Sequence, residues 1–127
     1  MNICSTALAW YRRRYGSAGQ WMKASRFYPA KLSWTKAPAW AFLIPLRDLR
    51  SARAVDIELL CQKQLGLHDF HVLKVPCSYL LQQLPHLDVR TTKSGDAIRL
   101  FLETAGTGCF TDQHVTRPVS LAAFLIP

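Results

Sequence analysis

The sequence predicts a small α+β domain: a mixed or mostly antiparallel sheet made of a meander plus a hairpin, one or two short helices, and a basic N-terminal arm. Three observations support this class. Short apolar or alternating segments follow residue 38, one segment there has clear helix boundaries, and the 127 residues, 50% of them hydrophobic, suffice for one core. We therefore expect an arm over residues 1–37 and a single domain over residues 38–127.

The first elements lie in the arm and directly after it. Residues 7–15 are compatible with two helical turns, which Gly16 would end because glycine readily leaves helical geometry. The near-continuous apolar run over residues 39–46 is short and aromatic, and it predicts a buried strand. Residues 48–51 follow this strand as a predicted turn.

Two further strands and a helix are predicted in the middle of the chain. Residues 53–62 alternate between apolar and polar side chains, which favours a strand over the competing helix that would begin near Asp48. Residues 69–75 predict the next strand of the meander. A short helix is predicted over residues 79–84, with Ser78 as its N-cap.

A hairpin and an apolar tail complete the chain. Residues 86–92 and 97–104 alternate, and the turn-forming residues 93–96 join them, which predicts a β-hairpin. Residues 119–127 are almost entirely apolar, and such a tail has to be buried. We expect it to dock on the protein's own sheet, and the surface of a partner is the alternative.

The positive charge of the chain is concentrated at its N-terminal end. The first 47 residues contain eight Lys and Arg and no Asp or Glu, so they carry the whole net charge of +8. They also hold nine of the fourteen aromatic residues. A cationic segment rich in aromatic rings is typical of proteins that neutralise phosphates and stack rings on unpaired bases. It predicts a polyanionic partner.

We therefore expect a nucleic-acid-binding protein without catalytic activity. The cations of the arm are expected to contact phosphates, and three rings are expected to stack on bases. These residues are Arg12, Arg13, Arg14, Lys23, Arg26, Lys31 and Lys36 for phosphates, and Tyr11, Tyr15 and Trp21 for bases. Whether the nucleic acid is DNA or RNA stays open. Met22 is an alternative start, and a chain beginning there would lack the three consecutive arginines.

Two other function classes stay open. An interaction or inhibitor protein would dock its basic segment and apolar tail on an acidic protein surface or a nucleic-acid-handling complex. A degenerate metal-dependent nuclease would use Asp56, Glu58 and Lys74, because carboxylates hold Mg²⁺ and a lysine can face the scissile phosphate. These residues faintly resemble the core of the PD-(D/E)XK nucleases, although Val72 stands where that family has an acidic residue. An ion-paired strand face is the ordinary alternative.

The cysteines and the missing motifs further restrict the possible function classes and the expected location. The chain has no CxxC pair and no secretory signal, so we expect reduced thiols and a cytoplasmic location. The four cysteines are Cys4, Cys61, Cys77 and Cys109. Two of them lie near His68 and His71, but the spacing matches no usual zinc finger. GxSxG, P-loop, GxGxxG and HExxH motifs are missing, and no apolar run reaches the roughly 18 residues that cross a membrane. We predict no catalytic residue, metal, cofactor or membrane contact.

Overall fold

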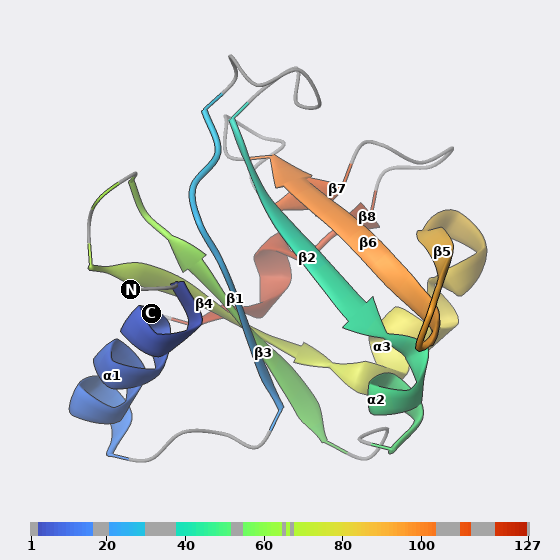
Figure 1. Cartoon of the computed structure of the whole chain (residues 1–127), viewed down its shortest axis with the longest axis horizontal. Helices are drawn as coiled ribbons and strands as arrows, with labels where there is room; N and C mark the ends of the chain where they lie inside the picture. Colours follow the sequence, from blue (N-terminus) through green and yellow to red (C-terminus); the bar gives the residue numbers. More distant parts are fainter. Residues whose placement is uncertain are drawn as a thin grey trace.

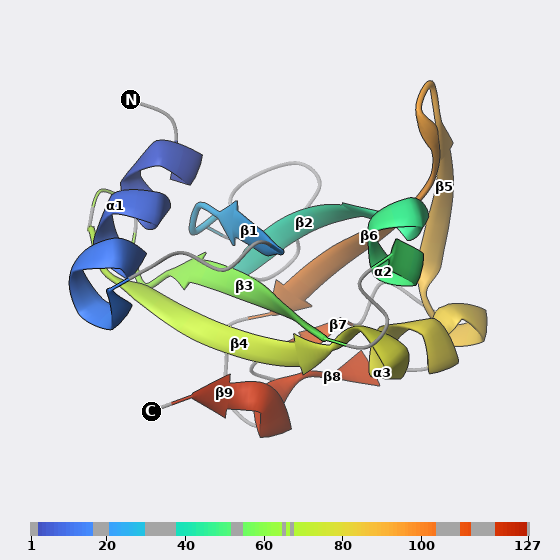
Figure 2. The same cartoon turned by 90° about the horizontal axis from the view of Figure 1, so that it is seen from below.

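Two β-sheets face each other across the main hydrophobic core, and one helix packs on the outer face of the first sheet (Figures 1 and 2). The computed structural model describes residues 3–16, 21–29, 38–51, 55–64, 66, 68–103, 110–112 and 119–126. Within these ranges no helix is long and apolar enough to cross a membrane. The predicted class, α+β with mostly antiparallel sheets and short helices, is confirmed.

The first sheet, sheet A, has the strand order β1-β3-β4-β9. Its strands are β1 (Met22–Ser25), β3 (Asp56–Gln62), β4 (Phe70–Pro76) and β9 (Leu125–Ile126). Strand β1 runs parallel to β3, and the other neighbours are antiparallel. The two strands that the sequence predicts in the middle of the chain are thus confirmed as the centre of sheet A. A strand from each end of the chain completes it.

The second sheet, sheet B, is built around one long central strand. It contains β2 (Ala39–Pro45), β5 (Asp88–Thr92), β6 (Gly95–Glu103), β7 (Thr111–Asp112) and β8 (Val119–Ser120). Strand β2 pairs with one edge of β6, while β5 and β7 share the opposite edge. Strand β8 then pairs with β7. The predicted first strand and the predicted hairpin are both confirmed.

Short helices close the ends of the sheets. The described helices are α1 (Ile3–Tyr15), α2 (Leu46–Ser51) and α3 (Cys77–Gln82), with the 3₁₀ turns η1 (Leu84–His86) and η3 (Ala122–Phe124). Helix α1 is the longest of them, and it lies at the opposite end of the molecule from α3 in both views (Figures 1 and 2).

Two local predictions are wrong. Residues 48–51 lie in α2 instead of forming a turn, because Leu46 and Leu49, one helical turn apart, are both buried in the core. Ser78 is not a helix cap: the N-cap of α3 is Pro76, and no side chain caps this helix. In α2, tertiary burial outweighs the local turn signal.

The main core fills the space between the two sheets. Strand β3 is buried on both faces, because Leu59 and Cys61 face this core while Leu60 faces α1. That arrangement explains why the alternation predicted for this strand breaks down at its end. The largest fully buried side chains of the main core are Ile44, Leu49, Ile57, Leu59, Leu73, Leu80, Ile98, Leu100, Leu102 and Leu121.

The apolar C-terminal tail lies against the protein itself. Val119 and Leu121 are buried in the main core, and β9 extends sheet A by pairing with β4. The expectation that the tail docks on its own sheet is therefore confirmed.

Two buried polar side chains join the basic N-terminal segment to both sheets. The Ser25 hydroxyl at the end of β1 accepts the backbone N–H of Ala41 at 2.8 Å. The Gln62 carboxamide of β3 accepts the backbone N–H of Phe27 at 3.0 Å, and its backbone carbonyl accepts the Trp40 indole N–H at 2.7 Å. Residues 22–28 are therefore part of the folded layers. The boundary predicted after residue 37 adjoins residues 30–37, which lie outside the described ranges.

Candidate functional site

Three consecutive arginines lie on the last turn of α1. Arg12, Arg13 and Arg14 are all exposed, and none of the ion pairs found in the described part of the chain involves them. Gly16 ends the helix with a φ of +88°, and its backbone N–H bonds to the Arg12 carbonyl at 2.9 Å. Cations at this position also interact favourably with the helix dipole, so they have a structural role whatever they bind.

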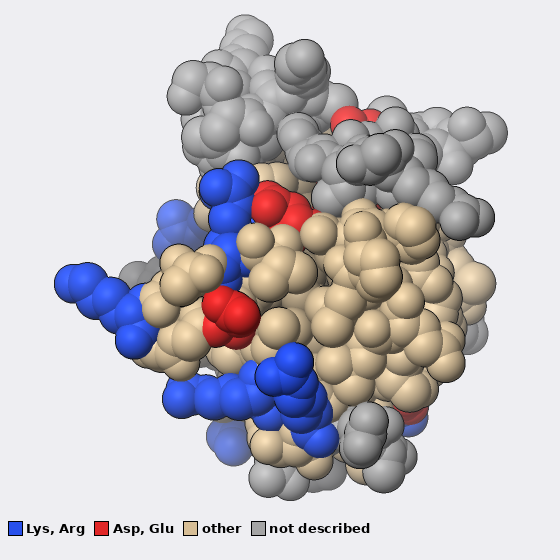
Figure 3. Space-filling view, turned by 90° about the vertical axis from the view of Figure 1, so that its right-hand side faces the viewer, with Lys and Arg blue, Asp and Glu red and all other residues tan. Residues whose placement is uncertain are grey.

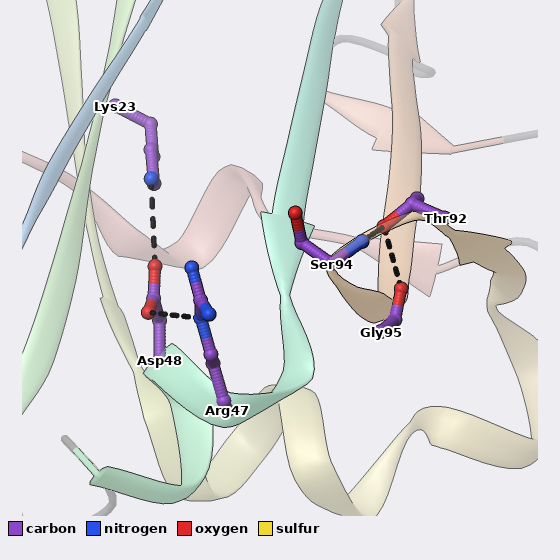
Figure 4. A network of polar contacts seen from close by, with 6 residues as sticks. All are labelled: Lys23, Arg47, Asp48, Thr92, Ser94 and Gly95. Atoms are coloured by element: carbon purple, nitrogen blue, oxygen red, sulfur yellow. Dashed lines mark hydrogen bonds and ion pairs between the residues drawn. The ribbon is translucent and has the colours of Figure 1, made fainter.

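The other predicted phosphate contacts have different environments. Lys23 on β1 reaches Asp48 of α2 at 3.5 Å, and Arg47 approaches the same carboxylate at 3.9 Å (Figure 4). Lys23 therefore links two elements of the fold, and its charge is largely offset. Arg26 is exposed. Lys31 and Lys36 lie outside the described residues.

On the side of the molecule that carries β5, the charged side chains of both signs gather mainly on one half of the view, and most of the described surface beside them is uncharged (Figure 3). In the view of this side, Lys and Arg atoms lie next to Asp and Glu atoms (Figure 3). Asp88 of β5 accepts from Arg90 at 2.9 Å and from Arg99 at 3.3 Å. These cations have carboxylate partners, whereas Arg12, Arg13 and Arg14 take part in none of the ion pairs found in the described residues.

The three predicted stacking rings are also placed differently. Tyr11 is only 9% exposed and faces sheet A. Its burial raises the pKa of its hydroxyl, and so does its hydrogen bond to Glu58. Trp21 is half-buried and packs against the main core. Tyr15, with 39% of its surface exposed, is the one of the three whose ring is open to solvent.

Tyr15 lines a cleft of about 210 Å³ between the C-terminal half of α1, the β3–β4 turn and β9. We call it the α1 cleft. Trp10 and Tyr15 form one wall, with their rings 6.2 Å apart at 76°. The Arg14 guanidinium lies 5.8 Å from the Trp10 ring centre and 5.9 Å from that of Tyr15, at cation–π distance from both. The side chains that line the cleft are Trp10, Arg14, Tyr15, Lys63, Asp69, Phe70, His71, Val72, Leu125 and Ile126.

An ion pair forms the polar side of the α1 cleft. Lys63 and Asp69 flank the β3–β4 turn and approach to 3.1 Å. The Asp69 carboxylate also accepts the backbone N–H of Phe70 at 3.0 Å and a hydrogen bond from the Trp10 indole. Burial raises the pKa of Asp69, but the Lys63 pair and these two hydrogen bonds outweigh it and lower the pKa below its usual value. Asp69 is therefore an ionised acceptor at neutral pH.

His71 connects the α1 cleft to the core. Its ring lies 5.8 Å from Trp40 and 5.4 Å from Phe110, edge-to-face in both cases. Burial lowers the pKa of His71, the positive charge of Lys63 lowers it further, and Asp69 opposes this effect. The imidazole is therefore neutral at pH 7.

The structure places only some residues of the nuclease and zinc-site hypotheses next to one another. Glu58 and Lys74 are direct neighbours across β3 and β4, but Glu58 accepts a hydrogen bond from Tyr11. Cys61 lies opposite His71, whereas Cys77 follows the far end of β4. In the part of the chain that is described, no three His, Cys, Asp or Glu side chains lie close enough to share a metal ion.

Comparisons with protein-family models, with curated proteins and with solved structures found no significant match to this chain.

Sequence reasoning missed much of the α1 cleft. Trp10 and Arg14 are four residues apart, so a helix over this segment places them on one face, and this signal was available. Lys63 and Asp69 had no such signal, because they come together only when β3 and β4 pair. The same is true of the β9 wall, which lies more than a hundred residues from Trp10 in the sequence.

Proposed function

We propose that this protein binds nucleic acid, without catalysing a reaction on it, through the last turn of α1. The observation that carries the proposal is the run of three exposed arginines, Arg12 to Arg14, beside a cleft with an open aromatic wall. Guanidinium groups bind phosphate oxygens well, and aromatic rings add stacking on bases. The two features are adjacent, as a nucleic-acid strand requires.

The distribution of charge supports this location. Lys23, Arg47, Lys63, Arg90 and Arg99 all form ion pairs with carboxylates. Each of them would have to lose a partner to contact phosphate, whereas the arginines of α1 would lose none of the ion pairs found in the described residues. Other exposed cations are also outside these ion pairs, namely Arg26, Arg50, Lys74 and Lys93. Arg12 to Arg14 differ from them because they are three consecutive cations beside an aromatic cleft. The described cysteines, Cys4, Cys61 and Cys77, form no disulfide, which is consistent with our expectation that the protein acts in the reducing cytoplasm.

The salt dependence of binding tests the proposal. Each phosphate neutralised by a cation contributes about 0.7 to 0.9 to the slope of log affinity against log salt concentration. Replacing Arg12, Arg13 and Arg14 together by alanine should therefore flatten this slope by about two to three units in an oligonucleotide anisotropy titration.

A second triple variant provides the matched control. Arg47→Ala, Arg90→Ala and Arg99→Ala remove the same charge from arginines that already have carboxylate partners. This variant should retain most of the slope, and circular dichroism should show that both variants are folded. An unchanged slope after loss of Arg12 to Arg14, or no oligonucleotide binding at all, would contradict the proposal. The second result would favour an acidic protein surface as the partner of the basic segment.

A further inference from the structure

We propose that the α1 cleft binds one unpaired nucleobase, so that the preferred ligand is a single strand. This inference rests on the proposed function, since the arginines of α1 supply the phosphate contacts. It adds a ligand class and a second group of residues, most of which lie outside the basic segment.

The size of the α1 cleft suits a single flat group. Pockets for drug-sized ligands typically enclose roughly 300–1,000 Å³. The α1 cleft encloses about 210 Å³ and is open to solvent through exposed Tyr15 and Leu125. A group the size of one base enters such a space, whereas a base pair does not.

The aromatic wall is held ready for stacking. The Trp10 ring packs on Phe70, with ring centres 5.4 Å apart. Its side chain is therefore already ordered before a ligand binds, which lowers the entropy cost of binding. The nearly perpendicular Trp10 and Tyr15 rings form a corner. A base stacked on the face of one ring therefore meets the edge of the other, which is a favourable aromatic arrangement.

The polar side of the cleft complements the edge of a base. Lys63 offers N–H donors, and ionised Asp69 offers acceptor oxygens, with 41% and 49% of their side-chain surfaces exposed. Every nucleobase has donors, acceptors or both along its edges, so this pair can hydrogen-bond to a base without requiring one particular base.

Arg14 lies where it could contact the phosphate of a nucleotide whose base occupies the cleft. Its guanidinium lies against both rings of the wall, and it is exposed. A phosphate attached to a base in the cleft would meet this charge first. In a duplex the bases are stacked and paired, and bringing one out costs a few kcal/mol. Single strands avoid this cost, which is why the cleft favours them.

The test compares two single strands with the same phosphates. One is a short oligothymidine, and the other is its abasic analogue of equal length. Stacking of one base contributes roughly 1–3 kcal/mol, so the wild-type protein should bind the oligothymidine at least about fivefold more tightly in anisotropy titrations. Arg13→Ala should lower the affinity for both strands to a similar extent.

Substitution of Tyr15 tests the cleft itself. Tyr15→Ser should bring the ratio of the two affinities close to one. The ratio is compared because loss of the Tyr15 ring beside Arg14 can also change the affinity for the abasic strand. Tyr79→Ser is the matched control, because Tyr79 is a half-buried tyrosine on α3 at the far end of the molecule (Figure 1). It should leave the preference intact. Tyr15 is chosen because its ring is exposed, whereas Trp10 supports the packing of Phe70.

An NMR titration of the wild-type protein tests the proposal without any variant. Thymidine 5′-monophosphate should shift the Trp10 indole N–H resonance in ¹⁵N-labelled protein and leave that of buried Trp40 in place. Equal affinity for the oligothymidine and abasic strands would overturn the base pocket while the nucleic-acid proposal stands. Duplex binding as tight as single-strand binding would also overturn it. Failure to bind either strand would overturn both proposals.

Discussion

The aromatic residues of α1 are close in sequence but differ in burial. Tyr11 is buried against Leu60 and Val72 of sheet A, whereas Trp10 and Tyr15 line the cleft. Helical rotation of about 100° per residue separates Trp10 from Tyr11. Tyr15 lies one turn after Tyr11 on nearly the same face, with the two rings 4.6 Å apart, and it is exposed at the last residue of the helix. The rings predicted from the sequence for stacking include Tyr11 and Tyr15, but not Trp10.

At the residue scale, His71 should make stability depend on pH. Its folded pKa lies below the ordinary value of 6.5, so the unfolded chain binds more protons between the two values. The contribution of His71 is therefore fully present above pH 6.5 and is lost as the pH falls through the folded pKa. Lys63 and Asp69 are the charged groups that act on it.

Urea unfolding at several pH values checks this prediction. The unfolding free energy of the wild-type protein should be level above neutral pH and decline below about 6.5. His71→Gln should remove most of the decline that precedes carboxylate titration. His68→Gln, which changes an exposed histidine three residues away, should retain it. The same decline in both variants would show that His71 is not its source.

At the element scale, the β5–β6 hairpin depends on its turn. Thr92 pairs with Gly95, so Lys93 and Ser94 form a two-residue turn. The Thr92 hydroxyl bonds to the Gly95 carbonyl at 2.6 Å and accepts the Ser94 backbone N–H at 3.2 Å (Figure 4). Gly95 has a φ of +113°, which side-chain-bearing residues rarely adopt.

Gly95→Ala should destabilise the protein by about 1–3 kcal/mol. A Cβ at this position would meet no atom within 4 Å, so the cost comes from the backbone conformation alone. Chemical denaturation monitored by circular dichroism gives the measurement. Ser94→Ala, a change at the neighbouring exposed turn residue, should alter stability by less than about 0.5 kcal/mol. Equal stability of Gly95→Ala and wild type would show that the hairpin tolerates another turn geometry.

At the scale of the whole molecule, the tail completes the core between the sheets. Val119 is 3% exposed and Leu121 is 1% exposed, and both belong to the main core, whose members come from both sheets. Burying each such side chain contributes roughly 1.5–3 kcal/mol. Net stabilities of single domains are only about 5–15 kcal/mol, so the tail is a large share of the total.

Removing residues 119–127 should therefore unfold the protein or lower its unfolding free energy by several kcal/mol. Thermal and urea unfolding of the shortened chain provide the measurement. Leu125→Ser is the control, because Leu125 is 41% exposed in the same tail and its loss should leave the fold intact. If the shortened chain had an unchanged unfolding transition, the tail would not be part of the core, and a contact with a partner would be the better explanation of its apolar composition.

The elements that sequence predicted correctly are those with a local signal. The strands β2, β3 and β4 follow from apolar runs or alternation, and the β5–β6 hairpin follows from its turn residues. The apolar composition of residues 119–127 already required their burial. The excess of positive charge in the first 47 residues is likewise a property of the sequence, and it still selects the class of partner that we propose.

Only the tertiary structure decided which parts of that charged segment are available for binding. The short β1, with the sequence MKAS, has no strand pattern of its own and exists because β3 offers it a parallel edge. Lys23 is engaged because α2 brings Asp48 to it. The α1 cleft joins residues 10–15, 63–72 and 125–126, which only strand pairing brings together. Composition and periodicity act over a few residues, whereas a binding site depends on distances between distant ones, and packing alone sets those distances.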